Sequence, residues 1–349
     1  MNASRIRHAL TATVITAAAV LCLTVAILFA AGAAPLDALK HLFLGSLGSW
    51  VKFSHVLMAW IPLTLCACGL LFTFRIDLWN IGVEGQVVAG AICATAVLRF
   101  GAGTGVPSFW IGAAFLAGLT GGALWAVLAG LLKTRGGVNE IFAGLGLNFV
   151  AQAVTLWLIF GPWRRPGIAS MSGTQPFDSD LWLPTLPGIR ISPVGLILAL
   201  GALGLTGWVL SKTRLGLALK AIGHNRIAAY LHGLKPDRAT LVAMGLAGAL
   251  AGAAGTFQVT GVYHRLIPAI SSNYGYLALL VVMLAGYRVG PVPAIAIFFA
   301  CLNVGSIQLP MMLQIDSSLS GIIQGTLVLA TLFIHGWRTR RPDVSKGGM

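Results

Sequence analysis

The sequence predicts an all-α polytopic membrane protein with about ten transmembrane helices, within a range of eight to ten. Of its 349 residues, 57% are hydrophobic and only 9% are charged, whereas soluble domains carry about 25% charged residues. The 44 glycines fit this class, because small residues let membrane helices approach one another closely. We therefore treat residues 1–349 as a single transmembrane domain.

Apolar runs of about 20 residues, the length that crosses a bilayer as a helix, recur along the chain. The first run follows Arg5 and Arg7, as a cleavable signal peptide would. It has 26 uncharged residues from Ala9 to Ala34, more than the about 7–15 residues in the apolar core of a signal peptide, so we expect it to be retained. The ten runs cover 9–33, 55–74, 81–100, 109–132, 141–162, 192–211, 239–262, 274–288, 290–309 and 318–336.

The last runs are the hardest to divide. Runs eight and nine are separated only by Arg288 and the turn signal from Gly290 to Pro293, so the sequence leaves open whether they are separate helices. With ten spans, the first five and the last five run in opposite directions through the bilayer. This parity permits an inverted repeat of two five-helix halves.

The basic residues predict the orientation. When the N-terminus is placed in the cytoplasm, 16 of the 23 lysines and arginines fall in cytoplasmic segments, as the positive-inside rule requires. Both termini are then cytoplasmic. The net charge of +14 is thus a topology signal, and because the basic residues form short clusters between apolar runs we expect no nucleic-acid partner.

A polar segment from Phe74 to Gln86 interrupts the apolar runs. Charge at membrane depth is costly and persists where it faces a cavity, pairs with a partner or reaches an interface. Glu84 lies between Gly82 and Gly85, where broken helix backbone could line a cavity. Two interpretations stay open: an interfacial turn that ties two helices together, and a direct part of a substrate route.

Amide side chains inside the apolar runs leave the same choice. Asn148 and Gln152 are one turn apart and share a helix face. Such amides commonly hydrogen-bond between membrane helices, at about 1 kcal/mol or less per bond. They also suit a ligand with many hydrogen-bonding groups and little charge. The candidate translocation path comprises Asn80, Glu84, Gln86, Asn148, Gln152 and Asn303.

The segment 212–238 alternates basic residues with Leu, Ala and Ile at near-helical spacing and then meets the stop signals Gly233 and Pro236. The pattern predicts a short amphipathic helix on the cytoplasmic side. Such a helix can lie on the membrane surface with its basic face toward anionic headgroups.

Catalytic motifs are absent from the sequence. No G-x-x-x-x-G-K-[ST] phosphate loop occurs, and neither a zinc-ligand cluster nor a nucleophile elbow is present. We therefore expect no catalytic residue, no metal and no cofactor in this chain, and no enzyme activity of its own.

Three segments resemble permeases of nucleoside and simple-sugar ABC importers, within the broad branched-chain amino acid and ribose-type permease family. They are Asn80-Ile81-Gly82-Val83-Glu84-Gly85-Gln86, then Gly137-Val138-Asn139-Glu140-Ile141 with Leu147-Asn148, then Thr213 to Gly233 with Gly223-His224-Asn225. The three occur in the family's order, and together with the C-terminal runs the resemblance covers nearly the whole chain.

The resemblance implies a multi-pass permease subunit of the bacterial inner membrane that translocates a nucleoside or a related sugar or base. It implies that 212–238 is a coupling helix docking on a separate ATPase subunit, which binds the ATP. The implied partners are that ATPase, a second permease in a heterodimer preferred over a homodimer, an extracytoplasmic substrate-binding protein and membrane lipid. The coupling positions are Gly223, His224, Asn225, Ala228, Ala229 and Gly233.

The alternative is an ion-coupled secondary transporter or a channel that acts without an ATPase. A carrier of that kind is expected to hold ionisable residues in mid-span, and few besides Glu84 occur here. The sequence therefore favours the ABC permease.

Overall fold

The computed structural model describes residues 35–101, 103, 105–167 and 173–313, with the isolated residues 25, 26, 29 and 325. All regular elements in these ranges are helices, which confirms the predicted all-α class. Among the described residues, six helices are long and apolar enough to cross a membrane. The predicted spans 9–33 and 318–336 lie outside the described residues.

The six long helices confirm the predicted spans two to seven. They are α3 (Trp50–Phe74), α4 (Val83–Gly101), α5 (Pro107–Thr134), α6 (Glu140–Phe160), α7 (Pro193–Lys212) and α10 (Pro236–Phe257), which continues as the π-helical turn η2 (Gln258–Tyr263). The other elements are α2 (Pro35–Leu47), the 3-10 turn η1 (Ser179–Leu181), α8 (Arg214–His224), α9 (Arg226–Leu231), α11 (Tyr274–Leu284) and α12 (Val292–Leu313).

Local sequence sets several helix starts. Proline occupies the first turn of α5, α7 and α10, where its missing N–H leaves no hydrogen bond unmade. Asn139 caps α6 by accepting a hydrogen bond from the Ile141 N–H, and Ser192 caps α7 by accepting one from the Gly195 N–H. These caps satisfy backbone donors that the helices leave unpaired at their starts.

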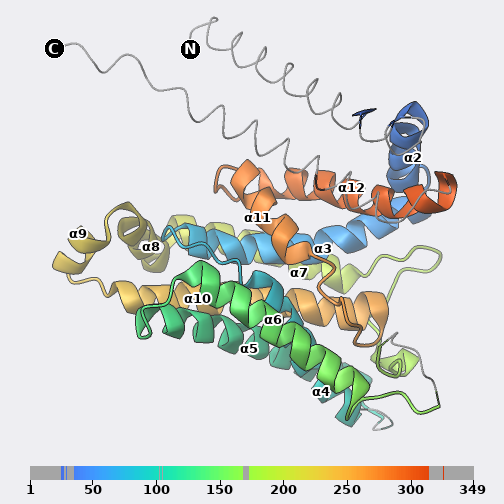
Figure 1. Cartoon of the computed structure of the whole chain (residues 1–349), viewed down its shortest axis with the longest axis horizontal. Coiled ribbons are helices and arrows are strands. Elements are labelled where there is room, and N and C mark those ends of the chain that lie inside the picture. Colours follow the sequence, from blue (N-terminus) through green and yellow to red (C-terminus); the bar gives the residue numbers. More distant parts are fainter. Residues whose placement is uncertain are drawn as a thin grey trace, which may run out of the picture. The chain divides into compact units, whose positions relative to one another are not determined.

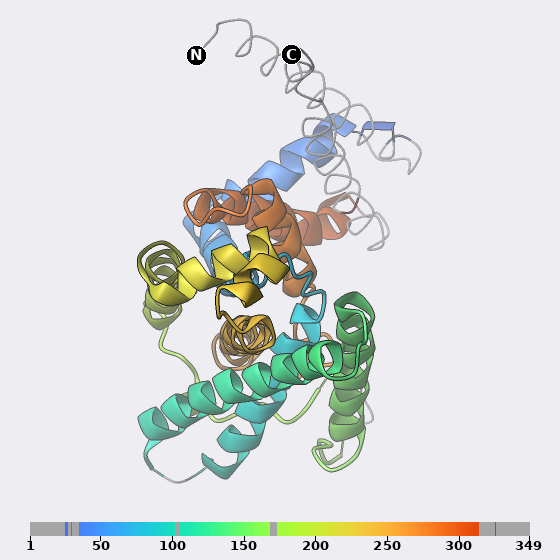
Figure 2. The ribbon, with the colours of Figure 1, turned by 90° about the vertical axis from the view of Figure 1, so that its left-hand side faces the viewer.

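The chain divides into two compact units, Leu57–Ile297 and a unit formed by Met1–Val56 with Phe298–Met349. In the larger unit, α4, α5 and α10 pack against one another and α6 packs on α4 (Figures 1 and 2). Glycines make the α5–α10 contact close: a Cβ on Gly122 would lie 2.7 Å from the Gly252 Cα. The glycine-rich face of α10 thus acts in helix packing, as such faces do in membranes.

The two ends of the larger unit carry different connections. Figure 1 shows α8 and α9 at one end and the described part of the connection between α6 and α7 at the other. The segment 212–238 and the connection between α6 and α7 thus lie at opposite ends of this unit.

The helix α11 is shorter than the predicted span 274–288. Its 11 residues extend about 16 Å, whereas the hydrocarbon core of a bilayer is about 30 Å thick. It is separate from α12, because the connecting turn places Gly286 and Tyr287 at φ values of +61° and +59°. Tyr287 packs on Phe74 at the end of α3, with ring centroids 5.1 Å apart, so α11 ends near the end of α3 and begins inside the bundle.

Candidate translocation and coupling site

The segment from Asn80 to Gln86 closes an irregular turn and starts α4. The Asn80 Nδ2 donates to the Gln86 Oε1 at 3.1 Å, and the Gln86 Nε2 donates to the Asn80 Oδ1 at 2.8 Å. The two side chains are only 1% and 0% exposed. Each amide thus supplies a donor and an acceptor to the other, which lets the turn sit among apolar helices.

Asn148 joins this turn to α6 and α11. Its Oδ1 accepts from the Gly85 N–H at 2.8 Å, a donor that the first turn of α4 leaves unpaired. Its Nδ2 donates to the Ile81 carbonyl at 3.0 Å and to the Tyr276 hydroxyl at 3.2 Å. Close backbone packing adds to these bonds, since a Cβ on Gly82 would lie 3.1 Å from the Cα of Gly144 in α6.

Glu84 lies against the first turn of α11. The side chain is 7% exposed, and a Cβ on Gly275 would overlap its Oε2 atom. Glu84 is also in the first turn of α4. The carboxylate therefore lies near two helix N-termini, whose partial positive charge favours an anion. Only glycine at position 275 leaves the carboxylate this space.

The remaining amides lie apart from this cluster. Gln152 is one turn beyond Asn148 on α6, and its Nε2 donates to the Pro268 carbonyl at 2.6 Å. Asn303 lies in α12, in the smaller unit, and is 9% exposed. Four of the six predicted path residues thus form one buried cluster, Asn80, Glu84, Gln86 and Asn148. That they border a substrate route stays a prediction.

Sequence reasoning missed the partners of this cluster. Gly144, Gly275 and Tyr276 lie on apolar helices and carry no motif of their own. One signal was available: Ser271, Ser272 and Asn273 directly precede an apolar run, a pattern typical of a helix start. A helix that starts inside the bundle directs its positive end toward a buried acid.

The segment 212–238 forms two helices where the sequence predicted one. Thr213 caps α8 by accepting from the Gly216 N–H at 3.2 Å, and Asn225 caps α9 by accepting from the Ala228 N–H at 2.9 Å. The second cap explains the break, because an N-cap residue leaves the helical conformation. Gly233 ends α9 at φ +82°, which confirms its predicted role as a stop signal.

The helix α8 packs directly on the turn before the cluster. A Cβ on Gly223 would overlap the carbonyl oxygen of Arg75, and it would lie 3.1 Å from the Ile76 Cα. The close approach of Gly223 is thus made within the chain. Leu219 and Ile222 are buried in the same core cluster as Phe72.

The other predicted coupling positions differ in exposure. His224, Asn225 and Gly233 are exposed and Ala228 is half-buried, whereas Ala229 is buried within the chain. The exposed apolar side chains of α9 are Ile227, Tyr230 and Leu231, at 75%, 67% and 78%. Contact of this segment with an ATPase stays a prediction.

At the opposite end, the connection between α6 and α7 is tied to the residues that follow α10. The Trp182 ring stacks on His264 with centroids 3.9 Å apart, and the Thr174 N–H donates to the Leu266 carbonyl at 2.9 Å. Burial, and to a lesser extent the charge of Arg190, lower the pKa of His264. The neutral imidazole is therefore favoured in this stack. No cluster of His, Cys, Asp or Glu that could hold a metal occurs among the described residues.

Several helices long and apolar enough to cross a membrane, with buried polar residues at the starts of α4 and α11, define a multi-pass membrane protein. The chain belongs to the family described as the permease component of the branched-chain amino acid transport system, which matches residues 53–332.

Relatives of the chain are permease subunits of ABC transporters. A glucose ABC transporter permease of Haloferax volcanii is 30% identical over 84% of this chain and 80% of its own length. A nucleoside permease of Lactococcus lactis is 26% identical over 80% and 79%. A guanosine permease of Bacillus subtilis is 26% identical over 77% of each chain.

Proposed function

We propose that this chain is the transmembrane subunit of an ABC importer in the bacterial inner membrane, and that it translocates a nucleoside or a related sugar or base. The relatives named for glucose, nucleosides and guanosine support this substrate class. A separate ATPase subunit binds and hydrolyses ATP, and this chain holds no cofactor. Ten spans with both termini in the cytoplasm complete the topology.

The observation that carries the coupling role is the exposed apolar face of α9. Tyr230 and Leu231 follow Ile227 by three and four residues, so both lie on its face of the helix, and each of the three is more than 60% exposed. Ala229 is buried against the chain's own core on the other side. Three large apolar side chains at a helical tip suit a protein partner, which we identify as the ATPase.

The same geometry gives the coupling a route into the chain. Motion of α8 acts on Arg75 through the contact with Gly223, and Arg75 precedes the turn that starts α4. Asn148 and Glu84 then connect this start to α6 and α11. An extracytoplasmic substrate-binding protein docks at the opposite end of the bundle.

We further propose that the chain pairs with a second, different permease. In support, two of its relatives are guanosine permease proteins from one Bacillus subtilis strain, at 26% and 23% identity. Copurification of the chain with its neighbouring gene products tests the pairing, and recovery of two identical permease chains would contradict it.

Truncation of the α9 face tests the coupling role. The double variant Ile227→Ala/Leu231→Ala should insert normally but lose ATPase association in a pull-down, and uptake should fall with it. Leu116→Ala is the matched control, since Leu116 is also an exposed leucine, at 66%, but lies in the spanning helix α5. If ATPase association survives and uptake responds only to Lys220→Ala/Arg226→Ala, the segment rests on lipid headgroups and the proposal is wrong.

A further inference from the structure

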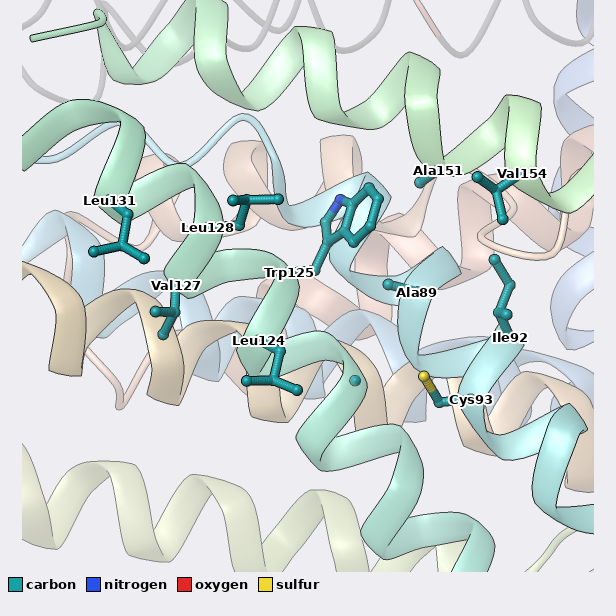
Figure 3. Close-up of a pocket in the computed structure, with 11 residues that line it drawn as sticks. Ala89, Ile92, Cys93, Leu124, Trp125, Val127, Leu128, Leu131, Ala151 and Val154 are labelled. Atoms are coloured by element: carbon teal, nitrogen blue, oxygen red, sulfur yellow. The ribbon is translucent and has the colours of Figure 1, made fainter. Parts of the chain in front are cut away.

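A lateral cavity of about 510 Å³ lies between α4, α5 and α6. Its lining includes Cys93, Leu124, Trp125, Leu128, Leu131 and Val154, and no charged side chain is among the lining residues. Figure 3 shows leucines of α5 along one side, with Trp125 between them and Ala151 of α6. None of the contacts described above for the candidate translocation path uses this space.

The cavity follows the direction of a lipid chain. Its lining on α5 runs from Gly121 to Leu131, a rise of about 15 Å. It stops three residues before α5 ends at Thr134. Half of the hydrocarbon core is also about 15 Å thick. The cavity therefore extends from near one membrane surface to about the middle of the bilayer.

The cavity opens where hydrocarbon surrounds the protein. Leu124 and Leu128 on its rim are 70% and 41% exposed, and both belong to a membrane-spanning helix. Apolar cavities do not hold water well, because water finds no hydrogen-bonding partner in them. A hydrocarbon chain is the occupant that the surrounding solvent supplies.

A basic residue lies where the headgroup of such a lipid would be. Arg135 is exposed and follows Leu131 by four residues, at the end of α5. Its neighbour Lys133 is already paired with Glu140. Basic residues at a membrane surface attract anionic headgroups. We propose that an anionic phospholipid binds here, with one acyl chain in the cavity and its phosphate near Arg135.

The indole ring of Trp125 lies between the cavity and the candidate translocation path. A Cβ on Gly85 would lie 3.1 Å from the Trp125 Nε1, so the indole contacts the start of α4 from the cavity side. A chain packed against Trp125 therefore stabilises the position of the turn that holds Glu84. In the proposed topology this lipid lies in the cytoplasmic leaflet. The site itself does not depend on that topology.

Quenching of Trp125 fluorescence by brominated lipid tests the site in the isolated full-length chain. The chain is reconstituted into phosphatidylcholine vesicles with a rising fraction of phosphatidylglycerol brominated on its acyl chains. Because the sequence has ten tryptophans, the Trp125 signal is the difference between wild type and Trp125→Phe. A bound anionic lipid should halve this signal at a mole fraction several-fold below that expected for random mixing.

Two kinds of variant, each with a control, separate a bound lipid from bulk contact. Arg135→Ala should raise the mole fraction of half-quenching toward the value for random mixing. Arg164→Ala, which removes an exposed arginine four residues beyond the end of α6, should not. Val154→Phe or Leu128→Phe fills the cavity and should protect Trp125, whereas Leu116→Phe, outside the cavity on α5, should not.

Quenching in simple proportion to mole fraction, or equal quenching in the filled variants, overturns the proposal. Loss of quenching on assembly with a second permease also overturns it, because a protein side chain then fills the cavity. The quenching measurement on the isolated chain needs no ATPase, substrate or second permease, so its outcome is independent of the proposed function.

Discussion

The buried amide pair of Asn80 and Gln86 offers a test of whether the segment from Asn80 to Gln86 only holds its own turn or also contacts the substrate. The perturbation is a double-mutant cycle with Asn80→Leu, Gln86→Met and both together, since these replacements keep roughly the original size. In each single variant the remaining buried amide loses both of its hydrogen bonds to the replaced side chain. In the double variant no amide remains to be satisfied.

The two hydrogen bonds set the expected magnitude. A buried polar group left without its partner costs about 1–3 kcal/mol. Hydrogen bonds between membrane helices average about 0.6 kcal/mol and reach about 1.7 kcal/mol, so two of them give a coupling energy of about 1–3 kcal/mol. Each single variant should therefore unfold more readily, and the double variant should recover most of the loss because removal of both partners can be nearly neutral.

The assay is reversible unfolding in mixed micelles, followed by circular dichroism, together with uptake of labelled nucleoside by the assembled transporter. If the pair only holds the turn, the double variant regains both stability and uptake. If the pair borders the route, stability returns but uptake does not. A double variant as unstable as the sum of the single ones would refute the reasoning, because the two amides would then act independently.

Two further predictions follow from the geometry. Gly223→Trp should displace α8 from Arg75 and abolish uptake, whereas Gly112→Trp, at an open position on α5, should be tolerated. Normal uptake and ATPase binding by the Gly223 variant would show that the contact between Gly223 and Arg75 does not transmit motion. In a cysteine-free background, a cysteine at Ser179 should react with an impermeant reagent in intact cells and one at His224 only after permeabilisation, and the reverse pattern would invert the topology.

Hydropathy predicted the long helices because their burial in lipid demands about 20 apolar residues, which is visible in one sequence. The same signal failed at α11, where Leu284, Ala285 and Gly286 continue an apolar run into a turn. What ends the helix is the left-handed backbone at Gly286 and Tyr287. Hydropathy carries no information about that conformation, so the predicted span was too long.

The candidate site was predictable in its residues but not in its contacts. The sequence identified Asn80, Glu84 and Gln86 as polar groups in an apolar context. It could not pair Asn80 with Gln86, because a spacing of six residues brings two side chains together only when the backbone between them leaves the helix. Nor could it place Gly223 on Arg75, a contact between residues 148 positions apart.

These long-range contacts limit how the residues from Asn80 to Gln86 and Asn148 can move. Asn148 is hydrogen-bonded to Gly85, Ile81 and Tyr276, and Glu84 packs closely on Gly275, so neither can move alone without breaking a buried contact. The contacts of α8 and α11 therefore favour movement of the turn from Arg75 to Gln86 as a unit. A unit of this kind can take part in a two-state change, provided that both the coupling end and the substrate bias its position. The polar residues that stabilise the fold would then also set the states between which the transporter alternates.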